Sequence, residues 1–227
     1  LWQDQAATSP AASGGDNVRR WLSRAGTKSL TNNVGFPTLQ TAVVNGNNTV
    51  RFLTAGGVGL YTAPAGSTTP DPASNYFTAA LNTRVYCLRV TSASTTGTAY
   101  NTGGRFMLDS GQYIGDFVST SPDRYFTYNW DGNADYANVA ESLSAFVIVS
   151  VQHIGGNIRV RVDRGSWATV ASGNTTNLGN YINILFNNGG TGSYADIQQI
   201  AFFNDAIGST DLEGVEDYFA SVAGITL

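Results

Sequence analysis

Residues 144–167 read SAFVIVSVQHIGGNIRVRVDRGSW, and this stretch decides the fold. Residues 145–151 are almost all β-branched or aromatic, which is typical of a strand that is buried on both faces. Residues 154–157, Ile-Gly-Gly-Asn, predict a tight turn, because Gly and Asn reach positive φ at little cost. Apolar residues then alternate with Arg159 and Arg161, which indicates a strand with one solvated face. The stretch therefore predicts a β-hairpin.

Short strand-like segments recur along the chain between turns rich in Gly, Asn and Ser. This regular spacing predicts an antiparallel sandwich or barrel. Residues 55–75 hold four Gly and three Pro without any period, so a long loop is expected there. One helix is expected over residues 210–223, with Thr210 and Glu213 as a capping box and Gly224 as the stop signal. The other expected strands cover residues 49–53, 76–81, 83–92, 104–110, 112–119, 124–130, 166–171, 181–186 and 197–204.

Composition limits the classes of protein that this chain can belong to. Its 227 residues show no linker or composition break, so a single domain over residues 1–227 is expected. The net charge of −4 without a basic stripe argues against nucleic-acid binding, and no apolar run is long enough for membrane insertion. The single Cys87 excludes an internal disulfide and reads as a buried thiol. The chain begins at Leu1 without an evident signal peptide, so we expect a processed product or a piece of a longer protein.

The catalytic chemistries that could be expected lack the residues they need. His153 is the only histidine, and nothing near it resembles a nucleophile elbow, so it reads as a strand-end residue. One His and one Cys do not complete an ordinary zinc site. The three glutamates, Glu141, Glu213 and Glu216, do not provide the alternating carboxylate pair of a retaining glycosidase. We therefore expect that the protein is not an enzyme.

Two sets of residues are candidates for binding. Asp131, Asn133 and Asp135 place oxygen atoms at alternate positions, which suits calcium, although an Asx-rich turn explains them too and is preferred. No other cofactor is expected. Residues 124–130 form an aromatic strand in which Phe126, Tyr128 and Trp130 are expected in the core, because a sandwich needs large residues inside. The opposite face is then exposed and suits sugar stacking. The candidate carbohydrate-binding residues are Tyr113, Tyr125 and Asn129.

Residues near both ends of the chain resemble a known family. Trp21 with Ala25-Gly26, then Phe36-Pro37-Thr38, then Asn45-Gly46 and Val50-Arg51-Phe52 resemble the opening of concanavalin A-like, laminin-G-like jelly-roll domains. Residues 196–204, DIQQIAFFN, and the following residues 212–220 resemble the closing strand and helix of that family. The resemblance implies an all-β fold, an antiparallel jelly-roll β-sandwich with one C-terminal helix. The family includes lectins, adhesion modules, phage virion proteins and modules attached to glycosidases.

The resemblance, together with a surface rich in Asn, Thr and Tyr, favours a non-catalytic carbohydrate-binding or adhesion module. We expect it on a phage particle or a secreted bacterial protein, hence extracellular or on a virion surface. Its partner would be a cell-surface glycan, bound through several displayed copies. The alternative is a structural virion protein, a capsid decoration or tail-fibre subunit, whose partners are neighbouring virion subunits. A glycoside hydrolase or lyase is the third hypothesis.

Overall fold

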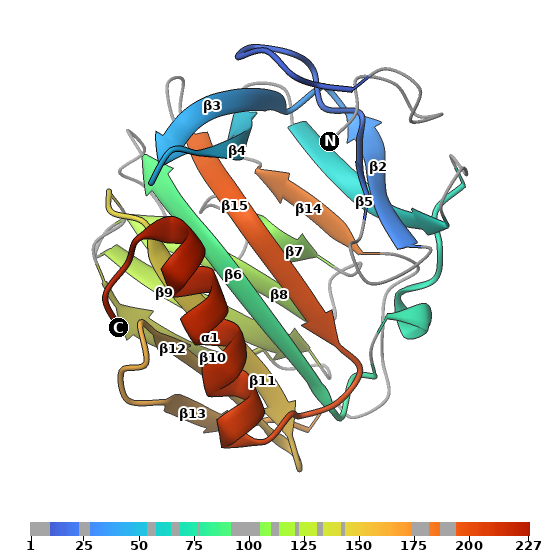
Figure 1. The fold of residues 1–227 in the computed structure, drawn as a ribbon. Coiled ribbons are helices and arrows are strands. Elements are labelled where there is room, and N and C mark those ends of the chain that lie inside the picture. Colours follow the sequence, from blue (N-terminus) through green and yellow to red (C-terminus); the bar gives the residue numbers. More distant parts are fainter. Residues whose placement is uncertain are drawn as a thin grey trace.

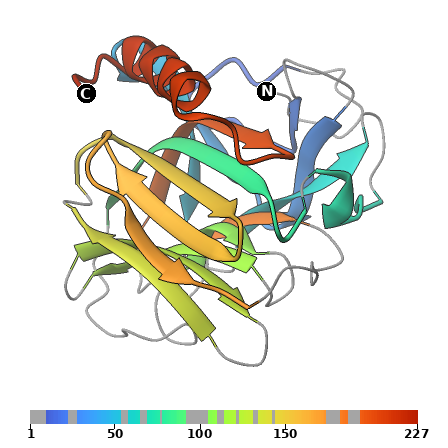
Figure 2. The ribbon, with the colours of Figure 1, turned by 90° about the horizontal axis from the view of Figure 1, so that it is seen from below.

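Two antiparallel β-sheets stacked face to face form the body of the protein, and the helix α1 lies across the outer face of one of them (Figure 1, Figure 2). The structure is a computed structural model that describes residues 10–22, 28–53, 58–64, 69–76, 78–91, 105–109, 114–120, 123–130, 134–141, 144–173, 182–186 and 194–227. The predicted all-β sandwich with one C-terminal helix is confirmed. No helix within these ranges is both long and apolar enough to cross a membrane.

One sheet has eight strands in the order β1-β2-β5-β14-β7-β8-β9-β10. Their bounds are Arg20–Leu22 (β1), Lys28–Val34 (β2), Val58–Pro64 (β5), Asn183–Phe186 (β14), Arg105–Asp109 (β7), Ile114–Thr120 (β8), Asp123–Trp130 (β9) and Ala134–Ala140 (β10). The pairing of β5 with β14 joins segments that lie far apart in the sequence. Bringing such distant segments together costs conformational entropy, so this sheet forms only when the early and late parts of the chain have met.

The other sheet has seven strands in the order β13-β12-β11-β6-β15-β4-β3. Their bounds are Ala168–Ala171 (β13), Asn157–Val162 (β12), Val147–Ile154 (β11), Asn82–Thr91 (β6), Tyr194–Phe203 (β15), Asn47–Leu53 (β4) and Thr38–Val44 (β3). A short 3₁₀ helix, Ala73–Asn75, precedes β6. The chain passes repeatedly from one sheet to the other, for example from β4 to β5 and on to β6, as in jelly-roll sandwiches.

Apolar side chains fill two separate layers of the molecule. Between the sheets, Tyr86 and Leu88 of β6 pack with Val149 and Val151 of β11 in the main core. The opposite faces of the same two strands meet α1 in a second cluster, which contains Val85, Cys87, Ile148, Leu212 and Phe219. Strand β11 is thus buried on both faces, as its unbroken apolar run predicts. Burial raises the pKa of Cys87 to about 12, so its thiol is an inert part of the second cluster.

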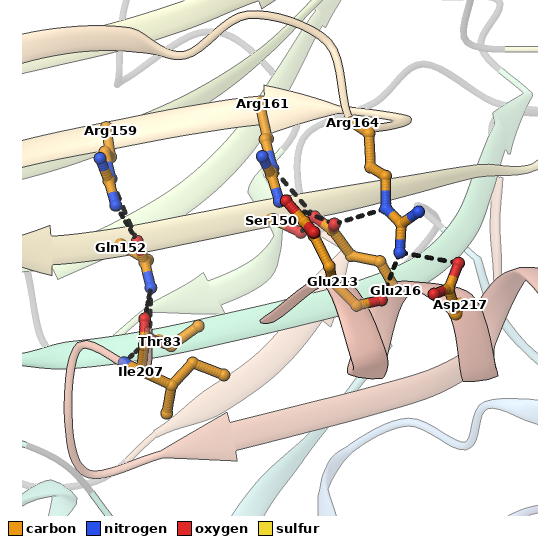
Figure 3. Close-up of polar contacts among 10 residues, drawn as sticks. All are labelled: Thr83, Ser150, Gln152, Arg159, Arg161, Arg164, Ile207, Glu213, Glu216 and Asp217. Carbon is orange, nitrogen blue, oxygen red and sulfur yellow. Dashed lines mark hydrogen bonds and ion pairs between the residues drawn. The ribbon is translucent and has the colours of Figure 1, made fainter. Parts of the chain in front are cut away.

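The predicted hairpin is confirmed, but its solvated face is confirmed only in part. Ile154 pairs with Asn157 at the turn, where Gly155 and Gly156 have φ angles of 55° and 78°. Two consecutive positive φ angles are typical of the type I′ turn that suits a two-residue hairpin. The solvated face expected on β12 is present only at Arg159, which stays partly exposed, because Arg161 is only 8% exposed. At Arg161 the outer face of β12 instead meets α1 (Figure 3).

The helix α1, Ser209–Ala223, ends as predicted but begins differently. Gly224 takes the left-handed conformation and its N–H bonds to the carbonyl of Ala220. Gly208 is the N-cap and no side chain caps the helix, so the predicted capping box of Thr210 and Glu213 is wrong. The helix starts one residue earlier than expected, which places Thr210 inside its first turn. At the other end, Asn45 and Asn47 donate to the carbonyl of Val222 at 3.3 and 2.8 Å.

Some strands differ from the sequence prediction. Residues 58–64, inside the expected loop, form β5, because Leu60 packs in the core between the sheets, Ala63 is also fully buried, and this burial outweighs the Gly and Pro content. Residues 78–81, expected in a strand, lie outside any strand. Strands β2 and β10 were not predicted, since both have few large aliphatic residues and depend on pairing with a neighbour.

A buried ion pair links the two sheets. Arg84 of β6 donates from Nε and Nη2 to the two carboxylate oxygens of Asp116 on β8, at 2.7 and 2.8 Å, and neither side chain is exposed. Arg84 also donates to Oγ1 of Thr127 on β9 at 3.2 Å, and the hydroxyl of Tyr86 donates to Asp116 at 2.7 Å. Burial alone would raise the pKa of Asp116, but the charge of Arg84 and these hydrogen bonds hold it below its usual range. The pair therefore stays ionised inside the sandwich.

His153 lies beside this pair, near the end of β11. Its Nε2 is 3.3 Å from Nη2 of Arg84 and its Nδ1 is 3.1 Å from the carbonyl oxygen of Ala79. A guanidinium only donates, so Nε2 accepts from Arg84 while Nδ1 donates to Ala79. Burial and the charge of Arg84 lower the pKa of His153 to about 3. The imidazole is therefore neutral and serves the packing between the sheets.

Replacing Asp116 with Asn is expected to lower the free energy of unfolding by about 3–5 kcal/mol, because Arg84 keeps a buried charge without a counter-charge. Urea unfolding followed by tryptophan fluorescence measures this loss. The double variant Arg84→Met, Asp116→Leu removes both charges and should recover most of it. An Asp116→Asn protein with an unchanged unfolding midpoint would contradict the buried pair.

The free energy of unfolding should also fall as the pH is lowered from about 6.5 toward 3. The pKa of His153 is about 3 in the folded protein, against 6.5 for an ordinary histidine, so within this window only the unfolded chain takes up its proton. One such group contributes a slope of up to about 1.4 kcal/mol per pH unit. Urea titrations across the window measure the slope. His153→Gln, which keeps an acceptor for Arg84, should flatten it, and equal slopes in the two proteins would refute this assignment.

Candidate binding surface

The residues predicted to bind carbohydrate do not form a common surface among the described residues. Tyr125 is fully buried in the core between the sheets, so the prediction that it is exposed is wrong. Thr127 points inward to accept from Arg84, and Tyr125, two residues earlier on β9, shares that face. Asn129 lies on β9 opposite Ile114 and Asp135. The side chain of Asn129 and the whole of Tyr113 lie outside the described residues.

The predicted calcium ligands are only partly described. Asp135 lies half-buried within β10, paired with Asn129, so it belongs to a strand and not to a loop. Asp131 and Asn133 lie outside the described residues. Among the residues that the structure describes, no group of three or more His, Cys, Asp and Glu side chains is placed to hold a metal ion. Calcium binding therefore stays a prediction.

Each buried carboxylate in the described part of the chain is held by a basic side chain. Asp116 is paired with Arg84, and the other three pairs are Asp71 with Lys28, Asp196 with Arg51 and Arg89, and Glu216 with Arg161 and Arg164. A glycosidase needs one carboxyl group as acid and another as base or nucleophile, both facing the bond to be cleaved. None of these four carboxylates is free for such a role.

The helix α1 is fastened to the seven-stranded sheet by Glu216, which is fully buried (Figure 3). Arg161 of β12 donates from Nε and Nη2 to its two oxygens at 3.0 and 2.7 Å. Ser150 of β11 donates to Oε1 at 2.5 Å. Arg164, just after β12, bonds to Glu216 at 3.2 Å and to Asp217 at 2.7 Å. Two arginines and two carboxylates balance here, so this cluster explains the position of the helix.

A second polar chain lies beside it on the same sheet (Figure 3). Gln152 of β11 accepts from Nε and Nη2 of Arg159 at 3.1 and 2.5 Å. The amide nitrogen of Gln152 donates to Oγ1 of Thr83 at 3.0 Å and to the carbonyl of Ile207 at 2.9 Å. Arg159 has no carboxylate partner in the described structure, and burial and then the charge of Arg161 lower its pKa. Arg159 therefore carries a positive charge that the described acidic groups do not neutralise.

Trp167, which follows β12, lies over these arginines. The guanidinium carbons of Arg159 and Arg161 are 4.3 and 4.6 Å from the centre of its ring. Both arginines rise from the outer face of β12, so they meet the ring from the side of the sheet. The indole is partly exposed and also packs against the apolar cluster beneath α1. Two cation–π contacts fix it as a platform on which the apolar face of a sugar ring can stack.

A third cluster is centred on Asp196 of β15, which is fully buried. Arg51 of β4 donates to its two oxygens at 2.7 and 2.8 Å, and Arg89 of β6 donates twice to Oδ2 at 3.0 and 2.9 Å. The strand register places the three residues side by side across the outer face of the sheet. Arg51 lies over the ring of Tyr194 at 3.9 Å, and Arg89 lies over Phe146 at 5.0 Å.

Sequence reasoning missed both arginine–aromatic clusters. The signal was present as an arginine at an outward position of an otherwise apolar strand. Such positions alternate with buried core residues, as Arg89 does with Leu88 and Val90. A charged side chain in this setting needs a partner on the same face. The alternation alone does not say which strand supplies that partner.

Comparison with known proteins supports the fold. No protein-family model and no curated protein matches the sequence. The structure is similar to the binding domain of botulinum neurotoxin DC, with 11% identity, a TM-score of 0.61, and coverage of 88% of this chain and 47% of that one. Botulinum neurotoxin type C matches at 12% identity and a TM-score of 0.59, with coverage of 91% and 51%. The binding domain of botulinum neurotoxin serotype D matches at 10% identity and a TM-score of 0.60, with coverage of 86% of this chain and 48% of that one. The chain thus spans about half the length of these proteins, and the likeness is one of fold.

Replacing Glu216 with Ala is expected to lower the free energy of unfolding by about 3 kcal/mol, because the nearly buried Arg161 loses its counter-charge. Thermal and urea unfolding measure the loss. Glu213→Ala is the matched control, since Glu213 lies one turn earlier on α1 with an exposed side chain. Equal effects of the two substitutions would mean that Glu216 does not fasten the helix.

Proposed function

We propose that this chain is a non-catalytic binding module that recognises carbohydrate on a cell surface. The observation that carries the proposal is Trp167, which is partly exposed and lies over Arg159 and Arg161 on the outer face of the seven-stranded sheet. A sugar ring would stack its apolar face on the indole. Arg159 bonds to Gln152 through Nε and Nη2, and its Nη1, which has no acceptor in the described part of the chain, would donate to a sugar hydroxyl. These are the two kinds of contact that orient a polar ligand on an aromatic surface.

The structural neighbours are compatible with this function. The binding domain of botulinum neurotoxin DC is known in complex with SialylT and with rat synaptotagmin II. Cell entry of botulinum neurotoxin type C is dependent upon interaction with two ganglioside molecules. These ligands belong to proteins about twice as long as the matched region. They support a binding role for a sandwich of this kind, while the choice of carbohydrate rests on Trp167.

Binding at a single platform should be weak, because one stacked ring and a few exposed hydrogen bonds contribute little once the loss of ligand freedom is subtracted. Display of several copies would give useful attachment. We propose that the module acts outside the cell, on a secreted bacterial protein or a phage particle. The alternative, a structural virion subunit that works through contacts with its neighbours, predicts no glycan binding at all.

The test is retention on immobilised neutral and acidic polysaccharides, with reducing ends followed in parallel. Trp167→Ala should weaken retention by about ten-fold or more, equivalent to about 1.4 kcal/mol. Tyr218→Ala is the control, because it removes another exposed aromatic ring, which is on the outer side of α1. Retention that is unchanged in Trp167→Ala would overturn the proposed site. New reducing ends would indicate an enzyme, and absence of retention in the parent protein would favour the structural subunit.

A further inference from the structure

We infer that Arg51 and Arg89, held by Asp196, form a subsite for the acidic group of a saccharide, a carboxylate or a sulfate. The inference rests on the proposed function for the saccharide part of the ligand, and on the charge and geometry of this cluster for the acidic part. The cluster shares the outer face of the seven-stranded sheet with α1 but involves none of the residues that contact Trp167.

The charges of the cluster do not balance. Asp196 is fully buried, while the side chains of Arg51 and Arg89 remain 23% and 27% exposed. Arg51 alone already makes a two-pronged contact with both oxygens of Asp196. The ion pairs of Arg89 in the described structure are with the same carboxylate. The cluster therefore keeps one net positive charge at the surface, in contrast to Glu216 and Asp217, which match Arg161 and Arg164.

The cluster also keeps hydrogen-bond donors for a ligand. Both arginines contact Asp196 through Nε and Nη2, so Nη1 of each one has no acceptor among the residues that the structure describes. The two side chains approach Asp196 from the strands on either side of β15, which directs both guanidiniums to one place. A carboxylate or sulfate accepts several charge-assisted hydrogen bonds at once and fits such an arrangement.

Aromatic rings beside the arginines favour a saccharide over a bare ion. Tyr194 lies under Arg51 and Phe146 lies under Arg89, and both rings are partly exposed. They limit the motion of the guanidiniums and offer apolar surface next to the charge. Backbone pairing already joins strands β4, β15 and β6, and Arg51 alone supplies a counter-charge for Asp196. The second arginine is explained by a negative charge that arrives with a ligand.

The experiment compares methyl glucuronoside with methyl glucoside, which differ only in the carboxylate, by NMR titration of the arginine Nε–H signals and by calorimetry. The parent protein should bind the glucuronoside at least about ten-fold more tightly, a difference of about 1.4 kcal/mol. Arg89→Ala should abolish this preference while Arg51 continues to neutralise Asp196. Arg19→Ala is the control, because it removes the same charge from an exposed arginine on another part of the chain. Arg89→Lys keeps the charge without the planar fork and should retain part of the preference.

Equal binding of the two methyl glycosides, or a preference that survives Arg89→Ala, would overturn the inference. Inorganic sulfate that binds as tightly as the glucuronoside would overturn the saccharide part of it. If Trp167-dependent retention of polysaccharides persists while the glucuronoside does not bind, the proposed function stands and this subsite fails. If the glucuronoside binds at Arg89 while no polysaccharide is retained, the subsite stands and the proposed function fails. A melting temperature for each variant excludes loss of binding through unfolding.

Discussion

The ion pair between Arg84 and Asp116 is the constraint on which the rest of the structure depends. Buried pairs contribute little net stability, but a mispaired partner is costly, so they favour one arrangement over its alternatives. This pair joins β6 to β8, and through Thr127 to β9. Because Arg84 points inward, alternation sends Arg89 outward on the same strand. The interior polar contact thus decides which residues reach the outer surface.

Features set by local geometry could be predicted from the sequence. The turn at Gly155 and Gly156 and the helix end at Gly224 each depend on a backbone conformation that glycine adopts easily. Features set by distant partners could not be predicted. Strand β5 exists because β2 and β14 pair with it, and Tyr125 is buried because Thr127 meets an arginine from the other sheet. Contacts with the opposite sheet decide which face of a strand is buried, and the local sequence carries no signal for them.

The residues of the proposed binding surface also meet through partners that are distant in sequence. Arg51, Arg89 and Asp196 come from three strands that are neighbours only in the folded sheet, so sequence spacing gives no hint of their contact. Arg159 and Trp167 are close in sequence, but the position of the indole also depends on the cluster that α1 forms with β6 and β11, against which it packs. Alternation identified Arg159 and Arg161 as outward-facing, while only the strand order shows what Arg51 and Arg89 face.

The contact between Asn47 and the end of α1 has a consequence for how the protein is produced. Asn47-Asn48-Thr49 matches the acceptor sequence for N-linked glycans. Both hydrogens of the Asn47 amide are engaged, one by Val222 and one by the carbonyl of Asn45 at 3.2 Å. A glycan would replace one of these hydrogens. If the protein is secreted through a eukaryotic host, a glycan attached to Asn47 during synthesis would therefore interfere with the docking of α1. A bacterial host that lacks this modification avoids the problem.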